Sequence, residues 1–348
     1  MKRKTLFSIL IVFIAVVVMV VPAYAQLGDT DVSSFTVQNV GGATAQTVTI
    51  TFVDENGNQT TPNPLNGGKS NPFSLAVGES FEVYVPGIPD LPSGRYSVMI
   101  SADQQIVAIA NLIGLGSINF NGSYSGFSGG APTFYLPAVV YNYYGWYSLM
   151  SVQNLGSSAA DVTVSITCSN GTVGTLTESD VQPMASAHFD LETTIPSGFT
   201  SSTSCNGSAV VSGGGENVVV VDNQTAPASG NTQSYSGVST GASKIYVPAL
   251  YTGYYGWNAS VNVRKLGTGT VSVSVSYSDG GSSSCSLTDL APSCLLYMPT
   301  EHPSAGYFGA TMTATGGDIV AVVNAANGSQ AQTYNGVMDG SGTETVGI

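Results

Sequence analysis

Hydrophobic and polar residues alternate with a period of two along much of the chain. The segments Val48–Phe52, Val162–Ile166 and Val271–Val275 each place Val, Ile or Phe at every second position, with Thr or Ser between them. This period is typical of β-strands that have one face on a core and the other in water. Asn-Gly, Asp-Gly and Gly-Gly pairs separate such runs, as tight hairpins require. No helical period is visible beyond residue 25, so the pattern predicts an all-β protein.

The first 25 residues have the three parts of a secretory signal peptide. A basic start at Lys2–Lys4 is followed by the apolar run Leu6–Val21 and by the small-residue site Ala23–Ala25. We expect cleavage before Gln26 and a secreted protein that is extracellular or held at the cell surface. An uncleaved membrane anchor is the alternative, because the apolar run is about as long as a short spanning helix. The cleavage-site pattern favours removal.

Two later segments match almost residue for residue and indicate internal repeats. Tyr135–Trp146 is YLPAVVYNYYGW, and Tyr246–Trp257, which starts 111 residues later, is YVPALYTGYYGW. The N-terminal region carries a weaker form of the same pattern, in which Val37–Asn39 corresponds to the Val-Gln-Asn at Val152–Asn154. Each repeat also ends with an apolar strand, a terminal Asn and then a Tyr-x-Gly motif; these asparagines are Asn111, Asn223 and Asn324.

The anchors divide the chain into a signal peptide at residues 1–25, three β-sandwich repeats and a tail. The repeats are expected at residues 29–130, 133–240 and 243–338, and the C-terminal tail at 339–348. Each repeat has about seven short strands in roughly 105 residues, as immunoglobulin-like or fibronectin-III-like sandwiches do. The chain resembles the Ig-like β-sandwich repeats of secreted bacterial cell-surface proteins. The resemblance implies an extracellular structural or adhesive role, although the antibody-type Cys…Trp…Cys pattern is absent.

Charge excludes one class of partner. Loss of the leader removes 3 of the 8 basic residues, so 5 basic residues face 21 acidic ones, a net charge of −16. A surface of this sign repels nucleic acid and anionic membranes. We therefore expect no nucleic-acid partner, and no other stretch is long enough to span a bilayer.

The four cysteines fit an exported chain. Four cysteines allow three pairings, and the repeat boundaries favour Cys168–Cys205 and Cys285–Cys294, one bridge in each of the last two repeats. Metal binding is the competing interpretation, but the sequence has no C-x-x-C motif and only two histidines. We therefore predict disulfides, with no metal and no cofactor.

Residues with the potential for catalysis are few, and they form no recognised motif. His188 and His302 lie outside any H-E-x-x-H pattern, and there is no G-x-S-x-G elbow, so we predict no enzyme. Both histidines are expected at solvated strand or turn positions. The stretch Asp54–Asn58 faintly resembles a calcium loop, but Leu65 stands where the distal Glu would be required. A hairpin turn explains this stretch better.

Two aromatic clusters are the strongest candidates for binding. One comprises Tyr143, Tyr144 and Trp146, and the other Tyr254, Tyr255 and Trp257. Exposed aromatic side chains of this kind can grip sugar rings, which would make the chain an array of carbohydrate-binding modules. The alternative is packing at the joints between repeats. Joint packing is favoured, because the first repeat has no such cluster.

The repeats are offset within the chain. Tyr135 lies eight residues after Phe127 and Tyr246 eight after Val238, so Thr345, eight after Val337, stands where another repeat would begin. The first repeat, conversely, has no Tyr-[Leu/Val]-Pro-Ala opening. One hypothesis is that the tail of another copy fills a sheet edge of the first repeat; a frayed tail is the alternative. Expected partners are thus other copies, cell-surface components or glycans.

Overall fold

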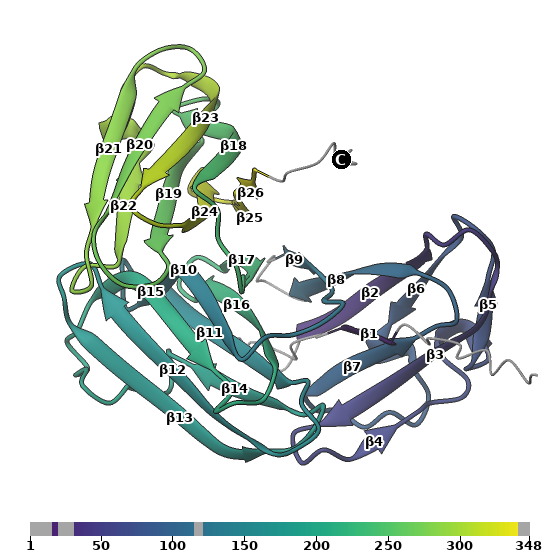
Figure 1. Ribbon diagram of the computed structural model, residues 1–348. Helices are drawn as coiled ribbons and strands as arrows, with labels where there is room; N and C mark the ends of the chain where they lie inside the picture. Colours follow the sequence, from purple (N-terminus) through teal and green to yellow (C-terminus); the bar gives the residue numbers. More distant parts are fainter. Residues whose placement is uncertain (1–15, 20–30, 115–120, 340–348) are drawn as a thin grey trace, which may run out of the picture.

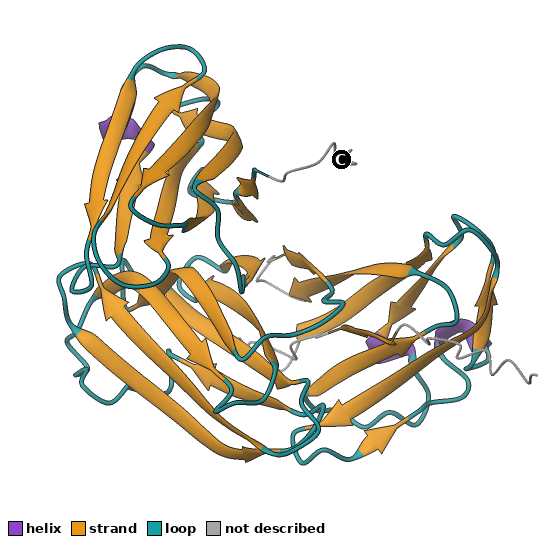
Figure 2. Cartoon of the chain, viewed as in Figure 1, coloured by secondary structure: helices purple, strands orange, loops and turns teal. Residues whose placement is uncertain are grey.

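The computed structural model describes residues 16–19, 31–114 and 121–339. The expected signal cleavage site and the tail from residue 340 lie outside these ranges. Strands dominate the described part of the chain, with one single-turn helix, α1 (Met298–Glu301), and two short 3-10 turns, η1 (Asn66–Gly68) and η2 (Val85–Gly87) (Figure 2). None of the described helices is long and apolar enough to cross a membrane. The all-β prediction is confirmed.

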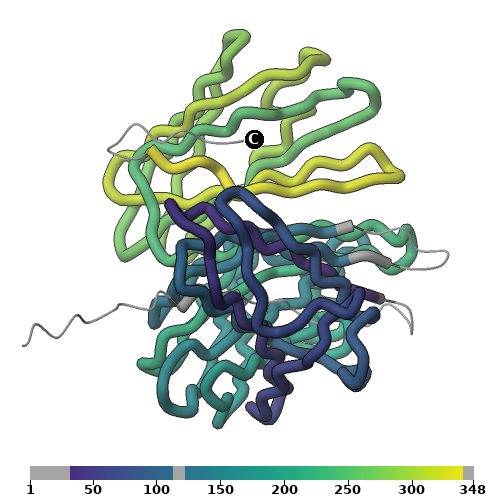
Figure 3. The backbone as a smooth tube through the Cα atoms, turned by 90° about the vertical axis from the view of Figure 1, so that its right-hand side faces the viewer, coloured from purple at the N-terminus to yellow at the C-terminus, as the bar shows by residue number. Residues whose placement is uncertain are grey.

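Six antiparallel sheets form within the described residues, and they pair face to face into three units that follow one another along the chain (Figure 1). Each unit has its own hydrophobic core, built from the inward faces of its two sheets. The third unit rises from one end of the second, and the first lies against the other side. A view turned by 90° shows the first unit in front of the second and the third above both (Figure 3).

The second unit shows the strand order most clearly. One sheet has the order β10-β15-β12-β13 and the other β14-β11-β16-β17. Its strands are β10 (Thr133–Tyr141), β11 (Tyr147–Asn154), β12 (Ala160–Cys168), β13 (Val173–Val181), β14 (Ser186–Asp190), β15 (Cys205–Ser212), β16 (Val218–Ala226) and β17 (Asn231–Ser236).

The third unit repeats this order. One sheet has the order β21-β20-β23-β18, with β26 beside β18, and the other β22-β19-β24-β25. Its strands are β18 (Lys244–Thr252), β19 (Asn258–Lys265), β20 (Val271–Tyr277), β21 (Ser282–Leu287), β22 (Ser293–Tyr297), β23 (Gly306–Thr315), β24 (Ile319–Ala326), β25 (Ala331–Asn335) and β26 (Val337–Met338).

The first unit also has this order, with β5 as an extra strand on β3. Its sheets run β1-β7-β3-β4 and β6-β2-β8-β9. The position of β10 and β18 is taken by β1, which lies inside the predicted signal peptide. The strands are β1 (Val16–Met19), β2 (Asp31–Asn39), β3 (Ala45–Asp54), β4 (Gln59–Thr60), β5 (Phe73–Leu75), β6 (Ser80–Tyr84), β7 (Tyr96–Ser101), β8 (Ile106–Gly114) and β9 (Asn121–Ser125).

The period-two segments produce the cores as expected. Along β12 the side chains of Val162, Val164 and Ile166 are fully buried, and along β20 those of Val271–Val275 alternate between buried and exposed. The Thr and Ser residues between them face outward because successive side chains of a strand point to opposite faces. Burial of this apolar surface, at about 25 cal/mol per Å², is the main force that holds each unit together.

The Tyr-[Leu/Val]-Pro-Ala segments open β10 and β18 and contain a bulge. The pairing register shifts between Leu136 and Val139 and again between Val247 and Leu250. Such a bulge leaves backbone groups outside the ladder. In the second unit the Tyr235 hydroxyl donates to the Ala138 carbonyl and lies 3.3 Å from the Ala138 amide nitrogen.

The third unit repeats this arrangement. There the Tyr334 hydroxyl donates to the Ala249 carbonyl and accepts from its amide at 3.1 Å. The Tyr of the closing Tyr-x-Gly motif thus pairs the backbone groups that the bulge exposes, and we call it the tyrosine clip.

The joints between units are closely packed. A Cβ atom added at Gly122 of β9 would lie 2.1 Å from the Ser234 hydroxyl of β17, so β9 and β17 approach at a distance that only glycine permits. On the other side of β17, the Asn335 side chain donates to the Ser236 carbonyl at 2.9 Å. Arg264 donates to Ser208 across the same joint. The units are therefore fixed to one another by specific contacts.

Candidate functional site

Both aromatic clusters fold as the tip of a tight hairpin. In the first, the Tyr143 and Trp146 backbones exchange two hydrogen bonds, of 3.2 and 3.0 Å, around Tyr144 and Gly145. Tyr144 and Gly145 have φ angles of 52° and 77°, the left-handed pair that a type I′ turn requires. Tyr255 and Gly256 of the second hairpin have φ angles of 49° and 82°. The Tyr-Tyr-Gly-Trp motif therefore encodes a type I′ hairpin turn, with Gly at a left-handed position that it favours.

The tyrosine at each hairpin tip is unusual. A left-handed backbone costs a residue with a Cβ about 1–2 kcal/mol, and Asn or Gly meets this demand better. Yet Tyr144 and Tyr255 are 87% and 86% exposed, so the core gains nothing from either ring. Each tip ring contacts the preceding tyrosine edge to face, with ring centroids 4.7 Å apart in both hairpins. Backbone strain combined with an exposed aromatic side chain is typical of a contact surface.

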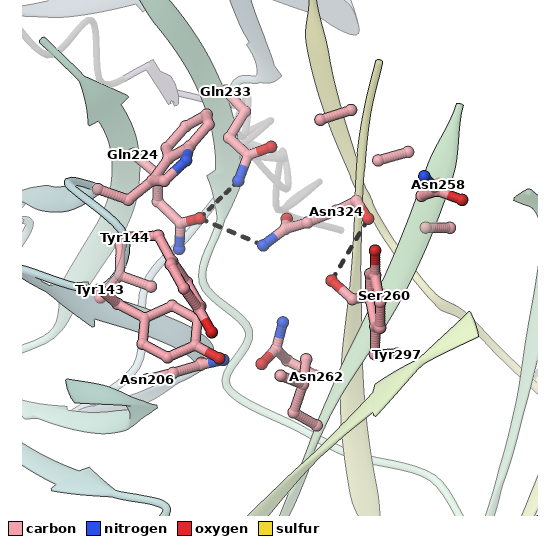
Figure 4. A pocket seen from close by; sticks show the side chains of 16 residues that line it. Tyr143, Tyr144, Asn206, Gln224, Gln233, Asn258, Ser260, Asn262, Tyr297 and Asn324 are labelled. Carbon is pink, nitrogen blue, oxygen red and sulfur yellow. Dashed lines mark hydrogen bonds between the residues drawn. The ribbon is translucent and has the colours of Figure 1, made fainter. Parts of the chain in front are cut away.

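The first hairpin borders a cavity of about 520 Å³ between the second and third units (Figure 4). In Figure 4, Tyr143 and Tyr144 lie on the side of the second unit, and Ser260 and Tyr297 lie opposite on the third. Four aromatic residues line the cavity: Tyr143, Tyr144, Trp146 and Tyr297. Its polar lining is made of amides and one hydroxyl, from Asn206, Gln224, Gln233, Asn258, Ser260, Asn262 and Asn324. No Asp, Glu, Lys, Arg or His belongs to this lining.

A hydrogen-bond network crosses the cavity wall and holds some of these amides in place. Gln224 Oε1 accepts from Gln233 Nε2 at 2.7 Å and from Asn324 Nδ2 of the third unit at 3.2 Å (Figure 4). Asn324 Oδ1 in turn accepts from the Thr333 hydroxyl at 2.7 Å. Asn223 and Asn324, which the sequence pattern placed at strand ends, lie within β16 and β24 and bond to the neighbouring strand: Asn223 accepts from Ser234 at 2.6 Å.

The second hairpin has different surroundings. Its residues do not line the cavity, and Tyr254 lies instead among the rings of Tyr251 and Tyr307. Tyr251 and Tyr254 are stacked with centroids 6.4 Å apart, and Tyr307 is more than half exposed. The six aromatic residues singled out from the sequence are therefore divided: three border the joint and three belong to an open patch on the third unit.

Aromatic faces beside fixed, uncharged amides are the groups that bind neutral sugars, through ring contact and hydrogen bonds. The hairpin residues were identified from the sequence. The amide lining was not, because it comes from β15, β16, β17, β19 and β24, which meet only through the packing of two units. Within the described residues, no group of three His, Cys, Asp or Glu side chains is placed to hold a metal ion.

Both histidines are less exposed than expected. The His188 side chain is only 5% exposed and lies at the joint of the first two units, where Nδ1 is 2.9 Å from the Ser151 hydroxyl. Burial, together with the charge of Arg95, lowers the pKa of His188 to about 3. The His302 side chain is 12% exposed and lies 3.1 Å from Asp279. The expectation of solvated positions is wrong because His188 on β14 is covered at the joint, and His302, which follows α1, packs against the rings of Tyr277 and Phe308.

Two further sequence candidates have structural roles. Disulfides join Cys168 to Cys205 and Cys285 to Cys294. The Asp54 carboxylate accepts hydrogen bonds of 2.9 and 2.8 Å from the backbone amides of Asn56 and Asn58. A carboxylate used in this way closes a hairpin turn.

The second unit holds a buried acid that the sequence pattern does not reveal. Asp222 is fully buried and accepts from Ser148 at 2.9 Å and from Gln224 at 3.1 Å. Burial raises the pKa of Asp222 to about 7, although hydrogen bonds from Gln224, Ser148 and Tyr235 partly oppose the shift. In sequence it follows four valines and is indistinguishable from a polar residue at a strand end.

The chain matches no protein-family model, and a search of curated proteins finds no relative.

Proposed function

We propose that the chain is an extracellular structural or adhesive protein made of three tandem Ig-like β-sandwich repeats. The observation that carries this proposal is the recurrence of one eight-strand order in three consecutive units, each with its own core. The units are joined by packed, hydrogen-bonded contacts, so the array extends as a defined body rather than as beads on loose linkers. Two disulfides fit the oxidising conditions outside the cell.

Surface labelling of intact cells tests this proposal. An antibody against the third unit should bind unpermeabilised cells or the culture medium, and N-terminal sequencing should begin at Gln26. Cells that lack the protein should lose adhesion to one another or to a surface, and the purified chain should restore it. Retention inside the cell, or unchanged adhesion and envelope integrity without the protein, contradicts the proposal.

Carbohydrate binding at the aromatic hairpins is a second candidate function. It is favoured by Tyr144 and Tyr255, which are exposed and stand where Asn or Gly would be less strained. The uncharged cavity beside the first hairpin would accept a neutral glycan, with ring contacts from the tyrosines and hydrogen bonds from the amides.

A glycan array with the purified chain tests this candidate. The variants Tyr144→Asn and Tyr255→Asn should each reduce binding, and Tyr144→Asn more so if the cavity takes part. Tyr84→Asn changes an exposed tyrosine of the first unit and serves as the matched control. A signal that none of the three variants changes would exclude the hairpins as the binding surface.

A further inference from the structure

Each of the last two units receives its edge strand from the segment that follows the preceding unit. After the first unit the chain continues into β10, which pairs with β15, and after the second into β18, which pairs with β23. The edge strand is held on its other side by the end of its own unit: Tyr135 pairs with Val238, and Tyr246 with Val337. The second and third units therefore place the incoming strand in the same way.

In the first unit the same edge is filled from the predicted signal peptide. β1 pairs antiparallel with β7, from Val16 opposite Ser101 to Met19 opposite Val98. The edge of β7 therefore accepts an apolar strand of four residues. Removal of residues 1–25 would leave the backbone groups along this edge without a partner, and such an edge readily pairs with another strand.

The tyrosine at the clip position of the first unit is a second observation on this edge. Tyr124 corresponds to Tyr235 and Tyr334, whose hydroxyls bond to the bulge of the edge strand. Tyr124 is only 4% exposed, yet its hydroxyl has no hydrogen-bond partner among the described residues. A buried hydroxyl without a partner is costly, so its presence points to a missing acceptor.

Residues 345–348 have the position and length to supply that acceptor. Thr345 follows Val337 by eight residues, as Tyr135 follows Phe127 and Tyr246 follows Val238. In this alignment Ile348 corresponds to Ala138 and Ala249, the residues whose carbonyls the clips bind. Thr345–Ile348 lie outside the described residues, so this step rests on sequence spacing.

We propose that the β7 edge and the Tyr124 hydroxyl of the processed chain form an acceptor site for residues 345–348 of a second copy. This inference rests on the tandem-repeat function proposed above and extends the same strand placement from neighbouring units to neighbouring molecules. Strand addition of this kind joins the tail of one copy to the head of the next. Because the two contacting surfaces differ, the contact continues into an open filament.

Assembly of the secreted protein, with leader removal verified by intact mass, is the primary test. Electron microscopy and light scattering should show filaments for the full chain and monomers after deletion of residues 340–348. The control replaces Ser341 and Thr343 by Gly, which keeps the length and leaves 345–348 intact, and it should assemble normally. Assembly that survives the deletion, or a full chain that stays monomeric, overturns the proposal. So does a mass that still includes the leader.

A synthetic peptide of residues 340–348 tests the acceptor separately. It should raise the melting temperature of the deletion variant and block assembly of the full chain, whereas the same peptide with Val346→Pro should do neither. Equal effects of the two peptides would contradict strand addition. Surface localisation and adhesion are read from cells, so the tandem-repeat function can stand even if this contact fails.

Tyr124→Phe distinguishes the clip from a merely structural residue. In the deletion variant it should leave the melting temperature unchanged, because the hydroxyl has no partner there to lose. In the full chain it should weaken assembly at least tenfold in critical concentration. Tyr334→Phe, the matched control, should lower the melting temperature of its own unit and leave the critical concentration within twofold. The reverse pattern would rule out Tyr124 as part of the acceptor.

Discussion

The second and third units share one backbone plan but fill it differently. Both have eight strands in one order, a bulged edge strand, a tyrosine clip and a Tyr-Tyr-Gly-Trp hairpin. The second unit places a polar cluster in its core, formed by Ser148, Asp222 and Gln224. Strand register puts Ala259, Val323 and Ala325 of the third unit at the same three positions. The two units thus share their turns, their bulge and their clip, whereas the same three core positions are polar in the second unit and apolar in the third.

Removing the disulfides should produce the largest difference in stability between the two units. Cys168–Cys205 closes a loop of 37 residues and Cys285–Cys294 one of 9. Loop-closure entropy predicts that the Cys168→Ala/Cys205→Ala pair costs about 4 kcal/mol and the Cys285→Ala/Cys294→Ala pair about 2.5 kcal/mol. Differential scanning calorimetry of the two double variants measures the difference. An equal loss, or a larger one in the third unit, would show that the bridges stabilise the units through native packing rather than through the entropy of the unfolded chain.

Loss of the clip hydroxyls should have the next largest effect. Tyr235→Phe and Tyr334→Phe each leave the carbonyl and amide of a bulge alanine without their partner. An unpaired buried polar group costs about 1–3 kcal/mol. The loss should be greater for Tyr235→Phe, because Tyr235 is buried whereas Tyr334 is only half-buried. Chemical denaturation followed by tryptophan fluorescence reports each unit, and a harmless Tyr235→Phe would mean that water can replace the clip.

The buried acid should give the second unit a pH dependence that the third lacks. The pKa of Asp222 is about 7 in the folded chain, against an ordinary value of 3.8, so the folded state binds the extra proton. Its stabilising effect is present at low pH and is lost as pH rises through 7. His188, with its pKa lowered to about 3, acts in the opposite direction: its stabilising effect is lost as the pH falls through its ordinary value of 6.5.

The difference between the melting curves of the unchanged chain and of Asp222→Asn, taken between pH 8 and 6.5, therefore isolates Asp222. Over this range Asp222 should give the second unit roughly 0.8 kcal/mol on acidification, and Asp222→Asn should remove this gain and leave only the smaller opposite slope of His188. The third unit, with Val323 at this position, is the internal control. A gain in stability on acidification that survives in Asp222→Asn would assign the pH dependence to another group.

The sequence predicted the parts of this comparison that depend on neighbours along the chain. Alternation located the core faces of β12 and β20, and the repeated motifs located the corresponding positions of the units. The clip, the acid cluster and the cavity wall could not be predicted in this way. Tyr235 meets Ala138 across 97 residues, and Ser148 meets Asp222 across 74. A polar residue in an apolar run gives no sign of which distant group will satisfy it.

The candidate site shows the same division. The two hairpins were identified because Tyr-Tyr-Gly-Trp is a local motif, and the left-handed Gly that it contains explains the turn. The different surroundings of the two hairpins depend on how whole units meet. The pairing of β1 with β7 was also missed, because an apolar leader carries no alternation that would mark it as a strand.

The hairpin tips should show the smallest effect on stability, and it should be a gain. Tyr144 and Tyr255 have nearly equal φ angles of 52° and 49° and nearly equal exposure, so replacing either by Asn relieves the same strain. Each variant should become more stable by less than about 1 kcal/mol, because Asn adopts the left-handed region more readily than Tyr. Calorimetry of the two single variants measures this. A loss at Tyr144 alone would mean that its ring supports the joint, whereas equal gains at both tips leave recognition as the reason for tyrosine.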